Sequence, residues 1–198
     1  MKSSRRVATS IFVTLALATA AVVLIRTPTV IIPPAAPVVP TTVYITDYGF
    51  HSRLLLPDGE GGLVQYAYGD WRYFALNQHG VVDGVAALFA PTPGTLARQE
   101  FSDLSDLRQV LGSDWQDTLL SISVANADVM ELVADLDARF HQNINSRVEG
   151  SNSELVFVRD SQTYTIFHNS NHELAAWLDQ LNCQVKGFVT WPNFRVKE

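Results

Sequence analysis

The feature that most constrains this chain is an uncharged, mainly apolar run from Val7 to Ile25. As a helix, these nineteen residues span roughly 28 Å, which is enough to cross the hydrocarbon core of a bilayer. A basic cluster within Lys2–Arg6 precedes the run and predicts that the N-terminus stays in the cytoplasm while the rest crosses. We therefore expect residues 1–26 to form a signal anchor with a transmembrane segment at 7–25.

A signal peptide that is removed is the alternative, because Ala18-Thr19-Ala20 has the A-x-A pattern of a cleavage site. The apolar run continues past this site to Ile25, which makes it longer than a usual signal core. We favour an uncleaved anchor for that reason. No cysteine lies near the run, so the pattern does not favour a lipoprotein.

Residues 27–42 contain five of the nine prolines of the chain. Proline has a fixed φ and no amide donor, so this stretch is predicted to be an extended, semi-rigid linker. The remaining residues, 43–198, are enough for a single extracytoplasmic domain with its own core.

The charge of this domain excludes some partners. Four of the fourteen basic residues and none of the twenty acidic ones lie within residues 1–42, which leaves ten basic against twenty acidic residues. That excess of acid argues against nucleic acid and against an anionic lipid surface, since both need basic patches. Cys183 is the only cysteine, so no internal disulfide is possible, and its apolar surroundings predict a buried side chain.

Hydrophobic periodicity and turn signals predict a mixed set of strands and helices in this domain. The elements do not alternate regularly, which favours an α+β fold with an antiparallel sheet and packed helices over a doubly wound sheet. The predicted strands are 43–45 and 54–56 around a turn at Tyr48-Gly49, 95–101, 118–124, and a hairpin of 154–159 with 163–167. The predicted helices are 81–90, 104–111, one from Asn126 through Phe140, and 171–181.

The most informative stretch is Tyr164 to Leu178, which reads as a strand, a polar corner and a helix with Ser170 at its start. Unpaired amides and the positive end of the helix dipole at such a corner stabilise an oxyanion. A nucleophile there needs a general base, for which His51 is the candidate, and Asp70 is a candidate to orient that base. The competing interpretation is a capping box, S-x-x-E, formed by Ser170 and Glu173.

A metal site is not favoured by the same stretch. His168 and His172 are four residues apart, a spacing that suits a metal on one helix face. The corner between them is expected to turn the two rings apart, and no third ligand stands at a suitable spacing. We therefore expect no metal and no other cofactor.

Three segments together resemble one bacterial family of unknown function, described as membrane-associated and in some members encoded near urease genes. VYITDYGFHSRLLLP resembles the opening of that family, and YAYGDWRYFA resembles its G-W-G-D-x-x-F-Y segment, with Asp70 in a matching place. The segment from YTIFHNSNHELAAWLDQLNCQV to TWPNF resembles the family's C-terminal part. The resemblance covers nearly all of residues 43 to 194.

That family in turn resembles the circularly permuted branch of the papain-like, NlpC/P60-type proteins, in which a strand histidine precedes a cysteine at a helix start. The resemblance implies that His51 is the histidine, that Ser170 stands in the place of the cysteine, and that Asn171 matches the asparagine after it. The family tryptophan two positions beyond the asparagine is replaced by Glu173.

These observations lead to three functional hypotheses. The first is an envelope protein in the bacterial inner membrane, or released to the periplasm after cleavage, whose thiol-less papain-like domain binds or scaffolds. The second is a serine-variant hydrolase or acyltransferase with Ser170 as nucleophile and His51 as base. The third is purely structural, with neither residue in a cleft. A peptide, lipid or glycan of the cell envelope is the expected ligand, and the oligomeric state is not predicted.

Overall fold

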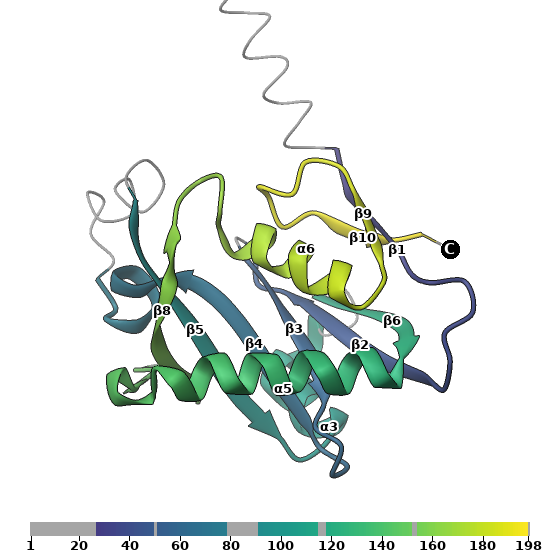
Figure 1. The fold of residues 1–198 in the computed structure, drawn as a ribbon, viewed down its shortest axis with the longest axis horizontal. Coiled ribbons are helices and arrows are strands. Elements are labelled where there is room, and N and C mark those ends of the chain that lie inside the picture. The colour runs from purple at the N-terminus through teal and green to yellow at the C-terminus, as the bar shows by residue number, and fades with distance from the viewer. Residues whose placement is uncertain (1–26, 50, 79–90, 115–117, 152–153, 198) are drawn as a thin grey trace, which may run out of the picture.

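The computed structural model describes residues 27–49, 51–78, 91–114, 118–151 and 154–197. Its main element is a seven-stranded antiparallel sheet with the strand order β6-β2-β3-β4-β5-β8-β7 (Figure 1). The predicted α+β class with an antiparallel sheet is therefore confirmed. The strands are β2 (Pro40–Asp47), β3 (Ser52–Pro57), β4 (Leu63–Asp70), β5 (Thr92–Phe101), β6 (Leu119–Ala125), β7 (Val148–Glu149) and β8 (Val156–Tyr164).

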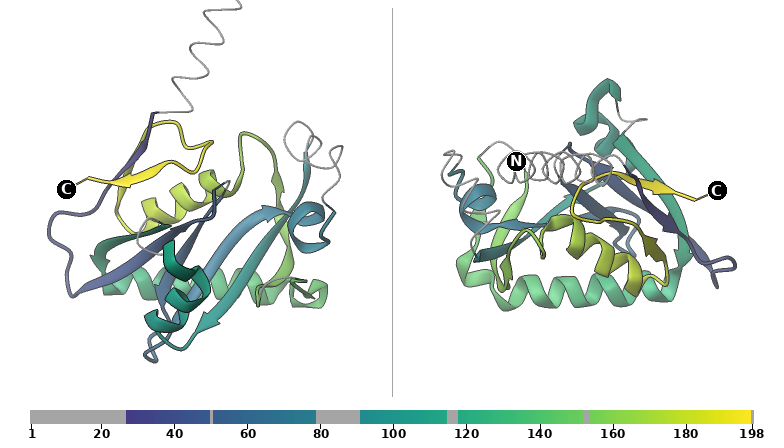
Figure 2. Two further views of the ribbon diagram at one scale, coloured as in Figure 1. Left: turned by 180° about the vertical axis from the view of Figure 1, so that it is seen from behind. Right: turned by 90° about the horizontal axis from the view of Figure 1, so that it is seen from above.

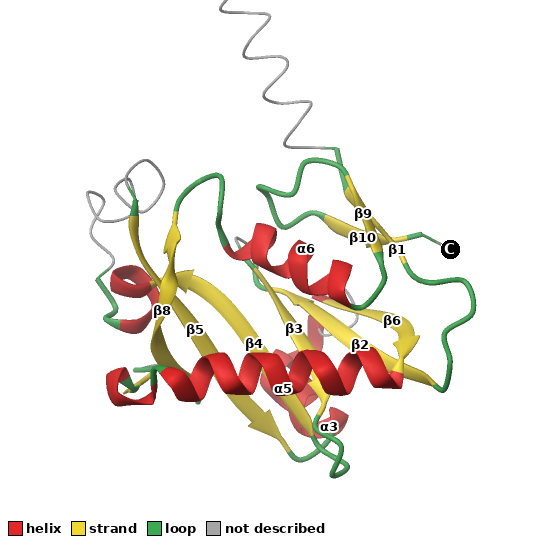
Figure 3. Ribbon diagram, in the orientation of Figure 1, coloured by secondary structure: helices red, strands yellow, loops and turns green. Residues whose placement is uncertain are grey.

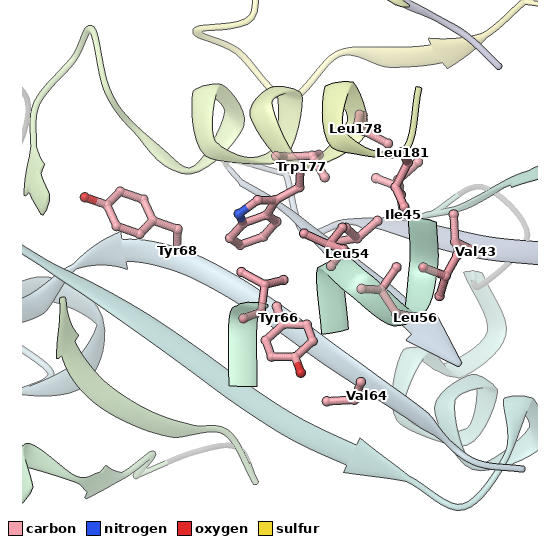
Figure 4. Close-up of a cluster of buried hydrophobic side chains, with 14 of the residues drawn as sticks. Val43, Ile45, Leu54, Leu56, Val64, Tyr66, Tyr68, Trp177, Leu178 and Leu181 are labelled. Atoms are coloured by element: carbon pink, nitrogen blue, oxygen red, sulfur yellow. The ribbon is translucent and has the colours of Figure 1, made fainter. Parts of the chain in front are cut away.

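Two helices, α5 (Asn126–Gln142) and α6 (Ser170–Gln180), cover one face of this sheet (Figures 1 and 3). The predicted helix from Asn126 through Phe140 is confirmed, and Val129, Leu132, Leu136 and Phe140 are buried at its 3.6-residue period, with Val133 at the edge of the cluster. Trp177 reaches from α6 toward Leu54 and Tyr66 of the sheet and is 2% exposed (Figure 4). Contacts with both helices thus make this face the main core of the domain.

The opposite face carries α3 (Leu104–Leu111) and a short π-helical turn, η1 (Trp71–Ala75) (Figure 2, left). Leu107 of α3 packs on Leu55 and Phe101, and residues of η1 pack in a second small cluster. The predicted helix 104–111 is confirmed, and Gly112 ends it with a φ of 75°. Single 3₁₀ turns follow at Gly112–Asp114 (η2) and Ile144–Ser146 (η3).

A second, three-stranded sheet joins the two ends of the described chain. Its strands are β1 (Thr29–Ile32), β9 (Gln184–Lys186) and β10 (Phe194–Val196), with β1 in the middle (Figure 1). The predicted linker at 27–42 therefore differs from the structure, in which β1 belongs to the fold and β2 begins at Pro40. The reason is long-range pairing: β1 bonds to strands more than 150 residues away, and Ile31 is fully buried.

The predicted hairpin of 154–159 with 163–167 is also corrected. Residues Val156–Tyr164 form one strand, which pairs with β5 through a register shift between Pro93 and Thr95. Asp160 does not turn the chain, because its side chain is buried and paired with Arg139. The hairpin of 43–45 with 54–56 is confirmed in β2 and β3, and the predicted helix 81–90 lies outside the described residues.

Within the ranges that the structure describes, no helix is both long enough and apolar enough to cross a membrane. The predicted anchor at 7–25 lies outside those ranges.

Candidate functional site

His51 is positioned by the tight turn between β2 and β3. The Tyr48 N–H donates a hydrogen bond to the His51 carbonyl at 3.0 Å, and Gly49 adopts a φ of 85° that favours glycine. The His51 ring is stacked on Tyr48, with 6.0 Å between ring centroids, and meets Phe74 of η1 edge-on at 5.0 Å. The imidazole is therefore held between two aromatic rings.

Ser170 is the first residue of α6 and is 4% exposed, but it is not the helix cap. Asn169 caps the helix, because its side-chain oxygen accepts hydrogen bonds from the N–H groups of Asn171 and His172 at 3.0 and 3.2 Å. Glu173 does not reach back to the helix start but pairs with Arg139. The capping-box interpretation of Ser170 and Glu173 is thus corrected to an asparagine cap one residue earlier.

The structure brings the two predicted segments together through their neighbours. The Ser52 N–H donates a hydrogen bond to Asn171 Oδ1 at 3.3 Å, so the start of β3 contacts the start of α6. No hydrogen bond between His51 and Ser170 exists in the described part of the chain. Side chains alternate along a strand, and His51 lines a cavity on the sheet face opposite α6, which Ser170 does not line.

Asp70 does not orient His51. Its Oδ1 accepts a hydrogen bond from the Tyr73 N–H at 2.7 Å and so caps η1, while Oδ2 is buried with no hydrogen-bond partner in the described chain. Asp70 also acts on Tyr164, whose pKa is raised to about 12 by burial and by the charge of this carboxylate. Asp70 therefore serves the local fold, and it does not line the cavity at His51.

The cavity at His51 has a volume of about 250 Å³ and lies between η1, the centre of the sheet and the segment after β7. Arg53 is the only charged side chain among its described lining residues. Burial lowers the pKa of this guanidinium, while the nearby Tyr48 acts in the opposite direction. Burial, followed by the charge of Arg53, lowers the pKa of His51 to about 4, so the imidazole is neutral at pH 7. The described lining residues are His51, Arg53, Ala67, Tyr68, Gly69, Phe74, Asn77, Thr95, Ala97, Gly150, Ser151, Leu155 and Phe157.

Sequence reasoning missed Arg53, although a signal was present. In HSRLLLP, Arg53 is a charged residue within an apolar strand, and it is two positions after His51. Residues two apart on a strand point to the same face, so a strand at this place puts both side chains together.

A buried ionic cluster on the other face of the sheet was missed as well. Arg139 of α5 donates to Asp160 at 2.6 Å and to Glu173, whose side chains are 1% and 4% exposed. His168 Nε2 lies 3.3 Å from Glu173 Oε2 but is not aligned for a hydrogen bond. Burial by itself lowers the pKa of Arg139, but the two carboxylates outweigh it and raise that pKa. The cluster ties α5, α6 and β8 together, and no local pattern links these positions.

His168 and His172 do not belong to a metal site in the described ranges, where no group of three or more His, Cys, Asp or Glu side chains is placed to hold an ion. The prediction that Cys183 is buried is confirmed: it is 2% exposed in the main core. Burial raises the pKa of its thiol to about 11, so the thiolate is disfavoured.

Comparisons of the chain with models of protein families, with curated proteins and with solved structures find no match.

Proposed function

We propose that this protein is a membrane-anchored envelope protein whose folded domain binds a ligand and does not catalyse its turnover. The finer fold that we propose is a permuted papain-like domain of the NlpC/P60 type, in which Ser170 stands in the place of the nucleophilic cysteine. The proposed ligand is a peptide, lipid or glycan component of the cell envelope.

The placement of His51 relative to Ser170 carries this proposal. A general base must come within about 3 Å of the proton that it removes, directly or through one water. The His51 ring instead packs between Tyr48 and Phe74 and lines a cavity to which Ser170 does not contribute. Its pKa of about 4 also makes it a weak base at neutral pH.

The state of Ser170 supports the same conclusion. Its side chain is almost fully buried, and Asn169 satisfies the helix amides that an active site of this kind would offer to an oxyanion. Serine also gains less than cysteine from a helix dipole, because the thiolate is the form that the dipole stabilises.

The proposed attachment to the membrane is through residues 7–25, with the domain in the periplasm; release after signal cleavage is the alternative. Strand β1 begins at Thr29, only four residues after Ile25. Four extended residues span at most about 14 Å. An uncleaved anchor would therefore hold the domain close to the bilayer surface.

Covalent labelling tests the absence of catalysis. We would treat the full chain in detergent with a fluorophosphonate and locate any adduct by mass spectrometry, with Ser170→Ala and His51→Ala as test variants. Ser121→Ala is the matched control, because Ser121 is exposed on β6. We expect no adduct on Ser170. An adduct that Ser170→Ala abolishes, that His51→Ala reduces and that Ser121→Ala leaves unchanged would establish the serine-variant hydrolase or acyltransferase instead.

A further inference from the structure

We propose that the cavity beside His51 binds a small carboxylate that carries a short apolar group, with Arg53 as the residue that recognises the charge. This inference deepens the proposed function, on which it rests, by naming the class of ligand. It concerns the face of the sheet opposite α6, so it does not involve Ser170.

The arginine is held in place but has no counter-ion among the residues that the structure describes. Its guanidinium carbon lies 3.9 Å from the centre of the Tyr48 ring, and Nη1 donates a hydrogen bond to Gln65 Oε1 at 3.1 Å. Gln65 is itself fixed, because its amide donates to Thr46 Oγ1 at 3.3 Å. Arg53 Nε is buried without a hydrogen-bond partner in the described chain, so these residues do not satisfy all the donors of the guanidinium.

Three other arginines of the chain have the carboxylate partner that Arg53 lacks among the described residues. Arg98, Arg139 and Arg147 each lie within ion-pair distance of at least one carboxylate. Arg53 has no such carboxylate among the described residues, and none of the described residues that line the cavity is acidic. A half-buried cation without a counter-charge among the described residues is costly to a fold, so an anionic ligand is the partner that this position fits.

The walls of the cavity define the rest of the ligand. Five of the described lining residues are apolar, from Ala67 and Ala97 on the sheet to Phe74, Leu155 and Phe157 around them, and they give the ligand an apolar wall to contact. The volume of about 250 Å³ corresponds to roughly eight water molecules at the density of the liquid. Arg53 supplies one positive charge and His51 is neutral, so a carboxylate monoanion matches the site better than a phosphate dianion.

Calorimetric titration of the full chain in detergent tests the proposal. The probes are butyrate, its neutral analogue butyramide, N-acetylalanine and inorganic phosphate. Butyrate represents an acyl source of the carboxylate, and N-acetylalanine represents the end of a peptide. We expect one or both carboxylates to bind at least tenfold more tightly than butyramide and phosphate, and the better of the two identifies the source.

Variants make the test specific to the site. Arg53→Gln is expected to weaken carboxylate binding at least tenfold, whereas Arg147→Gln removes the same charge from an exposed ion pair and is expected to change nothing. Arg53→Lys keeps the charge and is expected to bind with intermediate affinity, which covers the case in which Arg53→Gln does not fold. Equal binding of butyrate and butyramide by the parent chain, or equal loss in Arg53→Gln and Arg147→Gln, would overturn the proposal.

The two proposals fail separately. Ser170→Ala is expected to bind butyrate or N-acetylalanine as the parent does, because Ser170 does not line the cavity. A fluorophosphonate adduct on Ser170 together with Arg53-dependent carboxylate binding would reject the non-catalytic function and keep the ligand class. The absence of both would reject the ligand class alone.

Discussion

The backbone N–H of Ser52 donates a hydrogen bond to Oδ1 of Asn171 across 119 residues of sequence, at 3.3 Å. The same asparagine donates from its amide to the Thr190 carbonyl at 3.1 Å, so it joins the β2–β3 hairpin, α6 and the segment before β10. Asn171 is 1% exposed. Asn171 thus links three segments that are distant in the sequence.

We expect Asn171→Ala to lower the free energy of unfolding by about 2 kcal/mol, because it leaves the buried Ser52 N–H without a partner. Chemical denaturation measures this change. Gln109→Ala is the control, since that amide is exposed on α3, and a change below about 0.5 kcal/mol is expected there. Equal effects of the two substitutions would contradict the role of Asn171.

The position of the helix cap gives a second prediction. Asn169→Ala removes the two capping hydrogen bonds of α6 and is expected to cost about 1 kcal/mol of unfolding free energy. Ser170→Ala is expected to cost less than about 0.5 kcal/mol, because Ser170 caps nothing. Thermal or chemical unfolding of the two variants side by side decides between the caps. A larger loss in Ser170→Ala would restore the capping-box interpretation.

The ionic cluster predicts a large loss of unfolding free energy for Arg139→Met. Removing the cation leaves Asp160 and Glu173 buried without a counter-charge, which we expect to cost about 3–5 kcal/mol at pH 7. Urea denaturation at pH 7 measures this loss. Arg147→Met, from an exposed pair, is the control and should stay within about 0.5 kcal/mol.

Strand β1 can be tested through its buried side chain. Ile31→Ala is expected to lower the free energy of unfolding by about 2–4 kcal/mol, because Ile31 is fully buried against the core. Val38 lies in the same predicted linker but is 76% exposed, so Val38→Ala should have almost no effect. Differential scanning calorimetry of both variants would show whether residues 27–42 are a spacer, in which case neither substitution matters.

His51 predicts a loss of stability in acid. Its pKa is 6.5 in the unfolded chain and about 4 in the fold, where burial and the charge of Arg53 oppose protonation. Between these two values the unfolded state binds more protons, so stability falls as the pH decreases, by roughly 3 kcal/mol at pH 4. Chemical denaturation from pH 7 to pH 4 should show this loss in the parent and a smaller one in His51→Gln. His141→Gln, at an exposed position, should keep the loss of the parent.

The sequence was most informative where neighbouring residues decide the structure. The apolar period of α5 follows from contacts three and four residues apart, and helix α3 ends at Gly112 because glycine tolerates the φ of 75° that the cap needs. The β2–β3 hairpin follows from two apolar runs around one turn. Such patterns can be recognised in the sequence because the residues that contact one another lie near each other in the chain.

By itself, the sequence determined the α+β class, helices α3 and α5, and the absence of a cysteine at the start of α6. Only the tertiary structure decided what the polar residues do. Glu173 pairs with Arg139 instead of capping its own helix, and His51 shares a cavity with Arg53 instead of meeting Ser170. A polar side chain bonds to whichever partner the fold brings close, and on a strand its face is set by alternation, so neither outcome follows from spacing along the chain.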